Sequence, residues 1–332
     1  MAGDPRRTSR ADSEALEENG KVLDETREDD MGPKRLAPTV LFVLLTFTYG
    51  TCAQQFGKSA PAPSFPAWND NSLITVQKNG GDPKRLGYVK IEFYGHDAFK
   101  ITSPLGLTVL IDPWRNDPTG DYPKWFLNEF PPIRVDVVLS THAHFDHNAI
   151  ERPSGLVVLE RLVGQFTLGD IEVTGLADKH QCDRGSADSV AKTCPPNNVR
   201  EFDNAIQIVE TGGLRIAIWG DNRAAPDPSL DHYLRNVDVL ILPVDNVLTR
   251  AEADAIVRKY DPKAVIPSHY FVRGLTTDVS GLDSADGWVN EQAKVQDADV
   301  RRLDSAELTL NAAELNGTHA RIYYFGNHFE KQ

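Results

Sequence analysis

The chain is poor in basic residues: 35 lysines and arginines stand against 48 aspartates and glutamates, for a net charge of −13. Nucleic-acid phosphates are bound by clustered lysine and arginine, and no basic run occurs here. The charge balance therefore argues against nucleic acid and favours a small molecule as the partner. No pattern recurs at a period of about 20 to 50 residues, which argues against a repeat array. The remaining composition, 40% hydrophobic and 25% charged, is typical of a soluble globular protein with one large domain or two modest ones.

A long apolar run is also lacking. Spanning a bilayer takes about 20 apolar residues, and the apolar segment 36–47 is shorter than that. It follows two basic residues and precedes the small residues Thr51 and Ala53, so residues 31–53 are predicted to be a secretory signal peptide. Retention as a membrane anchor and lipidation at Cys52 are weaker alternatives. We therefore expect an exported protein, periplasmic or extracellular.

Methionine is scarce, and Met1 and Met31 are the only two in the chain. Residues 1–30 are mostly charged and small, without an apolar period, which is typical of a disordered segment. We hypothesise that translation begins at Met31 and that residues 1–30 are a misassigned extension. Residues 54–85 contain the prolines and serines of a linker, and the folded domain is predicted over residues 86–328.

The three cysteines leave one possible pair. Cys52 lies in the predicted signal peptide, so Cys182 and Cys194 would be the only cysteines of the mature chain. An even pair in an oxidising compartment predicts a disulfide that closes the polar loop between them. Two unrelated free thiols are the alternative.

Strand patterns outnumber helical ones in the predicted domain. The clearest helix is 249–260, where Thr249 and Glu252 form a capping-box pattern and Asp261-Pro262 ends it. Thr211–Gly213 has the composition of a hairpin turn. Mixed strands and helices predict a layered α/β or α+β domain. Strands are expected over ten segments: 88–95, 98–102, 107–112, 135–141, 156–160, 170–176, 205–213, 214–221, 237–244 and 264–269.

Histidine is scarce as well, with nine in the chain, yet His142, His144 and His147 crowd into one turn together with Asp146. Alternate residues of an extended segment share a face, so His142, His144 and Asp146 can point the same way at the end of an apolar strand. Imidazole nitrogens and a carboxylate that converge are the donors that a cation such as zinc binds. A solvated polar loop would not require this spacing.

Three further polar residues stand at predicted strand ends, where the ligands of open sheets tend to gather. They are His180, Asp221 and His269. Each is weak evidence alone, because an aspartate at a strand end is commonly a turn residue. Together with the first cluster they supply five histidines and two aspartates.

The segment "HAHFDH" (142–147) and these three later residues resemble the metallo-β-lactamase superfamily, whose signature is H-x-H-x-D-H. The resemblance covers about residues 86–328. It implies an αββα four-layer sandwich, two packed β-sheets with outer helices. It also implies a site for two divalent metal ions, in which His142, His144 and His180 bind the first, Asp146, His147 and His269 bind the second, and Asp221 bridges both. Zn²⁺ is the expected metal, although Mn²⁺ or Fe²⁺ would suit the same ligands.

The segments that flank these ligands resemble the branch of ascorbate-6-phosphate lactonase-like hydrolases. They are "FYGHDAFKI", "LTVLIDPW", "WGDN" and "VIPSHY". True metallo-β-lactamases typically lack the bridging aspartate, so Asp221 argues against β-lactams as the main substrate. The ribonuclease relatives need basic surface or extra domains, and the oxygen-reducing relatives carry a flavin domain that this chain has no length to encode.

The expected function is therefore an exported, metal-dependent hydrolase that cleaves a small ester, lactone or phosphoester with a metal-activated hydroxide. Asp146 is expected to transfer a proton in addition to binding metal. The alternatives are a β-lactam hydrolase and a non-catalytic binding or scaffold protein that uses its metal for folding alone. A complete set of seven ligands favours the enzyme, because structural zinc sites close with four.

Three more residues are candidates without a metal role. His96 and Asp112 both end predicted strands and are expected either to orient a metal ligand or to serve only packing and turn formation. Tyr270 follows His269 and is expected to donate a hydrogen bond to a bound oxyanion, or else to belong to the core. The loop 114–132, rich in aromatics and prolines, is a candidate wall of the site.

Overall fold

Ten strands form where the apolar segments predict them. The computed structural model describes residues 81–181, 203–244, 246–295 and 299–331, and Cys182 and Cys194 lie outside these residues. The predicted strands are β1 (Val89–Phe93), β2 (Phe99–Thr102), β3 (Thr108–Ile111), β4 (Arg134–Ser140), β5 (Ser154–Glu160), β7 (Ile171–Asp178), β8 (Asn204–Thr211), β9 (Leu214–Ile218), β10 (Val239–Pro243) and β11 (Ala264–Ser268). Four others were not predicted: β6 (Gly164–Leu168), β12 (Val300–Arg302), β13 (Glu307–Leu310) and β14 (Arg321–Tyr324).

The strands pair into two mixed sheets. One has six strands in the order β13-β1-β2-β3-β4-β5, and the other has eight in the order β12-β14-β11-β10-β9-β8-β7-β6. The hairpin between β8 and β9 turns at Gly212 and Gly213, whose φ angles of 63° and 76° suit the left-handed turn that glycine allows. The predicted turn at this point is confirmed.

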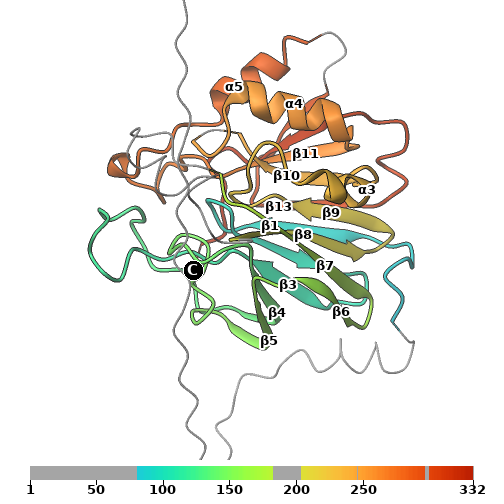
Figure 1. Ribbon diagram of the computed structural model, residues 1–332, viewed down its shortest axis with the longest axis horizontal. Helices are drawn as coiled ribbons and strands as arrows, with labels where there is room; N and C mark the ends of the chain where they lie inside the picture. Colours follow the sequence, from blue (N-terminus) through green and yellow to red (C-terminus); the bar gives the residue numbers. More distant parts are fainter. Residues whose placement is uncertain (1–80, 182–202, 245, 296–298, 332) are drawn as a thin grey trace, which may run out of the picture. The chain divides into compact units, whose positions relative to one another are not determined.

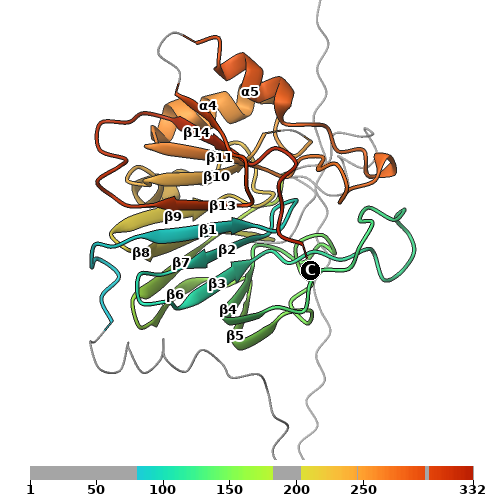
Figure 2. The same cartoon turned by 180° about the vertical axis from the view of Figure 1, so that it is seen from behind.

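Both sheets contribute to one apolar core. Figures 1 and 2 show them stacked, with β1 to β5 behind the longer sheet in Figure 1 and in front of it in Figure 2. Fully buried side chains from both, such as Ile91, Val137 and Ile208, belong to a single hydrophobic cluster. The predicted α+β sandwich is confirmed.

The helices of the described residues all fall between β9 and β12. They are α3 (Asp231–Leu234), α4 (Arg250–Tyr260) and α5 (Asp286–Gln292), with 3₁₀ turns η1 (Pro228–Leu230) and η2 (Asp278–Ser280). In both views α4 and α5 lie near β11. The predicted capping box of Thr249 and Glu252 is present in α4, which ends at Asp261 in a left-handed conformation. None of the helices that the structure describes is long and apolar enough to cross a bilayer.

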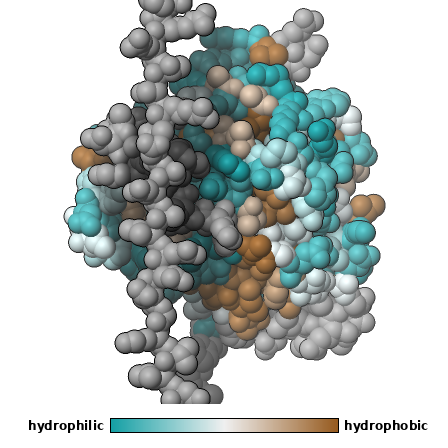
Figure 3. Space-filling model, viewed as in Figure 1, coloured by the Kyte–Doolittle hydropathy of each residue, from teal (hydrophilic) through white to brown (hydrophobic). Residues whose placement is uncertain are grey.

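The edge strands β5 and β6 leave apolar side chains in solvent. Figure 3 shows hydrophobic surface gathered over the region of β4 to β6. Leu156, Val158 and Val163 are 46%, 47% and 50% exposed in this region. The buried apolar core lies in the central strands of both sheets.

Strand direction brings the candidate residues to one edge of each sheet. In the six-stranded sheet β1, β3 and β4 run the same way, since β1 and β3 are both antiparallel to β2 and β4 is parallel to β3. By the same argument β7, β9 and β11 share a direction in the other sheet. The carboxyl ends of these six strands are therefore where polar side chains from distant segments can meet.

Candidate metal centre

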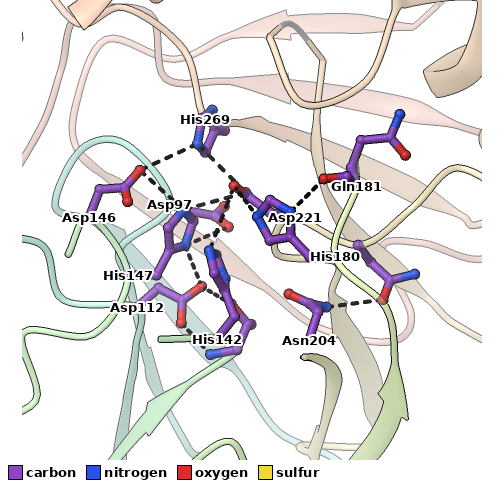
Figure 4. A network of polar contacts seen from close by, with 12 residues as sticks. Asp97, Asp112, His142, Asp146, His147, His180, Gln181, Asn204, Asp221 and His269 are labelled. Carbon is purple, nitrogen blue, oxygen red and sulfur yellow. Dashed lines mark hydrogen bonds and ion pairs between the residues drawn. The ribbon is translucent and has the colours of Figure 1, made fainter. Parts of the chain in front are cut away.

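Every predicted ligand follows the carboxyl end of one of these strands. The segment His142–His147 follows β4, and His180, Asp221 and His269 follow β7, β9 and β11. The two sheets touch here, because the amide of Ala205 in β8 donates a hydrogen bond to the carbonyl of Thr141 (2.9 Å). Figure 4 shows six of the seven side chains and their contacts at this junction.

The seven residues, together with His96, form two groups whose donor atoms lie close enough to hold a cation. The first group is His142, His144, His180 and Asp221, and the second is His96, Asp146, His147 and His269. Within each group the donor atoms lie within 4.8 Å of one another. His144 is exposed, and most of the others are buried. The second group contains His96, which the sequence placed in an orienting role rather than among the ligands.

Asp221 faces both groups, one carboxylate oxygen toward each. Its Oδ2 lies 3.7 Å from Nε2 of His142 and 3.3 Å from Nε2 of His180. Its Oδ1 lies 3.4 Å from Nε2 of His147 and 3.6 Å from Nε2 of His269. This is the arrangement expected of a carboxylate between two cations.

The donor atoms of the centre fit metal ions because most of them have no other partner. Nε2 of His142, His147, His180 and His269 and Oδ1 of Asp221 are buried without a hydrogen bond. Leaving one buried polar group unsatisfied costs roughly 1–3 kcal/mol. Several such atoms aimed at common points are explained by cations that they would ligate.

Neighbouring groups fix the ring orientation of three histidines. Nδ1 of His142 lies 3.0 Å from the hydroxyl of Thr141, and Nδ1 of His180 lies 2.5 Å from the carbonyl of Gln181. Nδ1 of His147 lies 2.9 Å from Oδ2 of Asp112. When each Nδ1 donates in these bonds, each Nε2 is left unprotonated toward the centre, which is the tautomer that binds a metal.

Asp112 is held in turn by Thr141, whose amide and hydroxyl donate to its two oxygens at 2.7 Å each. Asp97 is a second buried carboxylate beside His147, with 3.7 Å between its Oδ2 and Nδ1 of that ring. Both Asp97 oxygens are buried and have no hydrogen bond. Sequence reasoning missed Asp97, because it stands beside His96 in a segment without a ligand pattern.

Burial and neighbouring charges shift the pKa values of the side chains in the centre in different directions. Burial lowers the pKa of His142 well below its ordinary range and that of His147 to about 3. Burial acts in the same direction on His269, but the Asp221, Asp146 and Asp97 carboxylates outweigh it and raise its pKa to about 9. Despite burial, the surrounding imidazoles hold the pKa values of Asp146 and Asp221 well below the ordinary carboxylate range.

Burial has the opposite result for the other two carboxylates. It raises the pKa of Asp97 to about 7 and, together with the Asp97 charge, raises that of Asp112 well above its ordinary value.

Three residues of the centre also have left-handed backbone: φ is 59° at His96, 51° at Asp112 and 56° at His269. Backbone strain of this kind concentrates at functional sites. It is consistent with a role of His96 and Asp112 in orienting metal ligands.

His96 is placed to orient Asp146. Its ring is fully buried, and its Nε2 lies 3.0 Å from Oδ2 of Asp146, to which it can donate a hydrogen bond. Its carbonyl accepts a hydrogen bond from the amide of His269 (2.9 Å). The structure thus brings His96 into contact with Asp146, whereas the sequence left its role open between orienting a ligand and packing.

Tyr270 does not reach the centre, so the predicted hydrogen bond from its hydroxyl to a bound oxyanion is wrong. The side chain is fully buried, and its hydroxyl donates to the carbonyl of Gly326 (3.0 Å). The ring packs against Phe93 and Tyr324. A residue that follows a strand-end ligand points to the opposite side of the backbone, so Tyr270 belongs to the core.

The chain is similar to known metal-dependent hydrolases. A sequence model of the beta-lactamase superfamily domain matches residues 90–269, more than half of the chain. A UPF0173 metal-dependent hydrolase of Thermodesulfovibrio yellowstonii is 29% identical over 218 residues, which are 56% of this chain and 79% of that protein. A UPF0173 metal-dependent hydrolase of Koribacter versatilis is 29% identical over 210 residues, which are 55% of this chain and 84% of that protein.

Two solved structures are also similar. A protein of the metallo-beta-lactamase superfamily from Thermotoga maritima superposes with a TM-score of 0.49 at 19% identity, over 71% of this chain and 97% of that one. Igni18, a metallo hydrolase of Ignicoccus hospitalis, superposes with a TM-score of 0.45 at 18% identity, over 74% of this chain and 100% of that one.

Proposed function

Because this chain belongs to the metallo-β-lactamase superfamily and is a metal-dependent hydrolase, we propose that it holds two divalent cations and hydrolyses a small ester, lactone or phosphoester. The position of Asp221, with one oxygen toward each group of histidines, carries the proposal. A single structural cation would leave half of these donors unpartnered. Two cations would use all of them.

The residues divide between the two positions as the family signature implies. His142, His144 and His180 would hold one cation, and Asp146, His147 and His269 the other, with Asp221 shared. Zn²⁺ suits this set best, because five of the seven donors are imidazoles. Bound cations would supply Lewis acidity that polarises the scissile carbonyl or phosphoryl oxygen and activates a water molecule.

Asp146 is the residue proposed to move the proton. Its carboxylate stays ionised, since its pKa lies well below the ordinary range. His96 steadies it through the 3.0 Å hydrogen bond at Oδ2. As an ionised carboxylate beside the centre, Asp146 is proposed to accept a proton from the attacking water and to return it to the leaving group.

Metal analysis combined with turnover tests the proposal. We expect about two metal ions per chain in protein expressed from Met31 and purified without chelator. The same sample should hydrolyse at least one compound in a panel of lactones, carboxylic esters, phosphomonoesters, phosphodiesters and a β-lactam, and chelator should abolish turnover. Asp146→Asn should retain the fold and lose at least about 100-fold in turnover.

Each alternative has its own outcome in this experiment. One tightly held metal without turnover would indicate the scaffold protein, in which the centre serves folding. Preferential cleavage of the β-lactam would indicate an antibiotic hydrolase. Full activity of Asp146→Asn would remove the proton-transfer role and leave Asp146 as a ligand alone.

Export is proposed from the signal pattern over residues 31–53 and is tested separately. The mature chain should be recovered outside the cytoplasm and should begin at Gln54. A peptide from residues 2–30 in the native protein would contradict the proposed start at Met31. Recovery of the uncleaved chain in the membrane would support an anchor instead.

A further inference from the structure

Three aromatic side chains lie beside the group of Asp146, His147 and His269, and we refer to Tyr122, Trp125 and Phe145 as the aromatic wall. Phe145 stands between the candidate ligands His144 and Asp146 in the chain. Its ring centre is 5.1 Å from that of Trp125 and 5.5 Å from that of Tyr122. The edge of Trp125 packs on His96, with 6.2 Å between ring centres. Trp125 and Phe145 therefore border the centre, and Tyr122 extends the wall through its contact with Phe145.

The wall is accessible to solvent although it is apolar. Trp125 and Phe145 are half-buried, and Tyr122 is 59% exposed. Trp125 and Phe145 pack against the hydrophobic core with part of their surface and leave the rest exposed. Exposed apolar side chains that lie together mark binding sites more often than side chains scattered singly.

The loop that carries Tyr122 and Trp125 is firmly attached on both sides. Phe126 is fully buried and stacks on Trp114 at 4.3 Å. Its amide and carbonyl both bond to the side chain of Asn116 (2.8 and 3.0 Å). The carbonyl of Trp125 accepts a hydrogen bond from the amide of Thr277 (2.8 Å), in the segment that follows His269. The wall is thus held at a fixed place beside the centre before any substrate binds.

The candidate ligands have no cationic side chain beside them in the part of the chain that the structure describes. Among the described residues, the contacts of the seven candidate ligands involve no lysine or arginine. A phosphate dianion is usually bound by arginine or lysine, and no such side chain contacts the described ligands.

We propose that the aromatic wall binds the apolar acyl group of the substrate, so that the enzyme acts on esters or lactones of apolar or aromatic carboxylic acids rather than on phosphoesters. The inference rests on the proposed hydrolase function. The carbonyl carbon would lie at the centre and the acyl chain would extend over Phe145, Trp125 and Tyr122. Selectivity for the acyl group would then depend on these three side chains.

Turnover of 4-nitrophenyl acetate, butyrate, hexanoate and phenylacetate by the metal-loaded enzyme tests the inference. Burying one methylene group corresponds to a factor of about four, so kcat/KM should rise roughly fourfold per added methylene until the wall is covered. Trp125→Ala and Tyr122→Ala should each reduce the hexanoate-to-acetate ratio by about two- to tenfold. Tyr88→Ala is the control, because Tyr88 is a similarly exposed tyrosine (64%) far from the centre. It precedes β1, whereas His96 follows the other end of that strand.

Metal content is measured for each variant, because Trp125 touches His96 and its loss can disturb the centre. Tyr122 contacts Phe145 rather than His96. A changed acyl preference in Tyr122→Ala with unchanged metal content would therefore report on acyl binding and not on damage to the centre. Binding of 4-phenylbutyrate and of butyrate, measured by calorimetry, provides a readout without turnover. The phenyl compound should bind at least about tenfold more tightly, and Tyr122→Ala should reduce this preference.

The outcomes distinguish the two proposals. Equal kcat/KM for all acyl chains, or a phosphoester cleaved better than every carboxylic ester, would overturn the acyl inference and leave the hydrolase. Absence of turnover with two metals bound would refute the hydrolase and with it the substrate class, and the calorimetric preference would then decide only whether the wall binds an apolar acid. Equal binding of 4-phenylbutyrate and butyrate would refute it.

Discussion

Asp112 contacts a candidate ligand, and we expect it to orient that ligand rather than to bind a metal. Its Oδ2 lies 2.9 Å from Nδ1 of His147 and leaves Nε2 toward the centre. Partners of this kind are worth about 10- to 100-fold in metal affinity. We expect Asp112→Asn to weaken binding of one of two zinc ions by this factor, measured by competition with a chromophoric chelator.

Asp136 offers a matched control for this experiment. It accepts hydrogen bonds from the amide and hydroxyl of Thr108 (2.8 and 2.9 Å), as Asp112 does from Thr141, but it lies within β4 away from the centre. Asp136→Asn should leave both zinc affinities unchanged. Equal effects of the two substitutions would show that Asp112 acts only through general stability.

His269 should make the metal-free protein less stable at high pH. Its pKa is raised to about 9 by the carboxylates around it, whereas a histidine of the unfolded chain titrates at about 6.5. The folded state therefore binds this proton more tightly, and the resulting stability is fully present below pH of about 6.5 and is lost as the pH rises through about 9. The loss should be on the order of 3 kcal/mol, the equivalent of the pKa difference.

Urea unfolding of chelator-treated protein between pH 6 and 10 measures this loss. His269→Gln should remove most of the pH dependence. The matched control is His319→Gln, because His319 is exposed and lies 3.3 Å from Asp261. An unchanged slope in His269→Gln would assign the effect to another group, such as His180, whose pKa is also raised.

The sequence predicted the residues that carry a spacing signal or that end a predicted strand, His96 and Asp112 among them. The H-x-H-x-D-H spacing and the strand-end positions were sufficient to identify the seven residues that the structure brings together. Asp97 had no such signal, because its role depends on which loops the two sheets bring near one another. The aromatic loop 114–132 was predicted as a candidate wall of the site, but without the single side chains that form it. Tyr270 was misassigned, since adjacency to His269 in sequence is not proximity to the centre in space.

At the scale of elements, Gly220 sets how closely the segment after β9 approaches the segment after β4. Its φ is 55°, and a Cβ atom there would lie 2.6 Å from Oγ1 and 2.7 Å from Cβ of Thr141. We expect Gly220→Ala to lower the free energy of unfolding by about 2–4 kcal/mol, from overpacking and left-handed strain together. It should also weaken zinc binding, because Thr141 holds Asp112 and the ring of His142.

Gly326→Ala separates the strain from the contact. Its φ of 61° is nearly the same, but no atom lies within 4 Å of the Cβ position. Denaturant unfolding of both variants should show a loss of only about 1–2 kcal/mol at Gly326. Equal losses at the two glycines would mean that the approach to Thr141 is unimportant.

Strand prediction succeeded where apolar residues ran together and failed where they were few. The ten predicted strands lie in the interior or contribute a continuous apolar face. Of the missed strands, β12 (VRR) is mainly polar, β13 (ELTL) alternates, and β6 is an exposed edge strand with polar residues between its apolar ones. The strand β14 (RIYY) was missed although its last three side chains are buried. Their pairing depends on neighbours far along the chain, as β13 pairs with β1.

At the scale of the whole domain, the centre joins the two sheets. The segment His142–His147 comes from the six-stranded sheet, and His180, Asp221 and His269 come from the eight-stranded one. Cations that bind both sets would favour the assembled sandwich over any state in which the sheets separate. Ligands that bind only the folded state stabilise it by about 2.7 kcal/mol at a concentration of 100 times Kd.

Metal removal should therefore lower the melting temperature of the whole domain in a single transition. For a domain of this size, about 2.7 kcal/mol corresponds to roughly 5–10 °C. Calorimetry before and after chelation, with zinc added back, measures the difference. A His142→Gln/His269→Gln double variant should melt near the chelated protein and should not respond to chelator. If metal-free and zinc-loaded protein melted at the same temperature, the centre would serve chemistry without holding the sheets together, and the unpaired imidazoles would have to be accommodated by the fold itself.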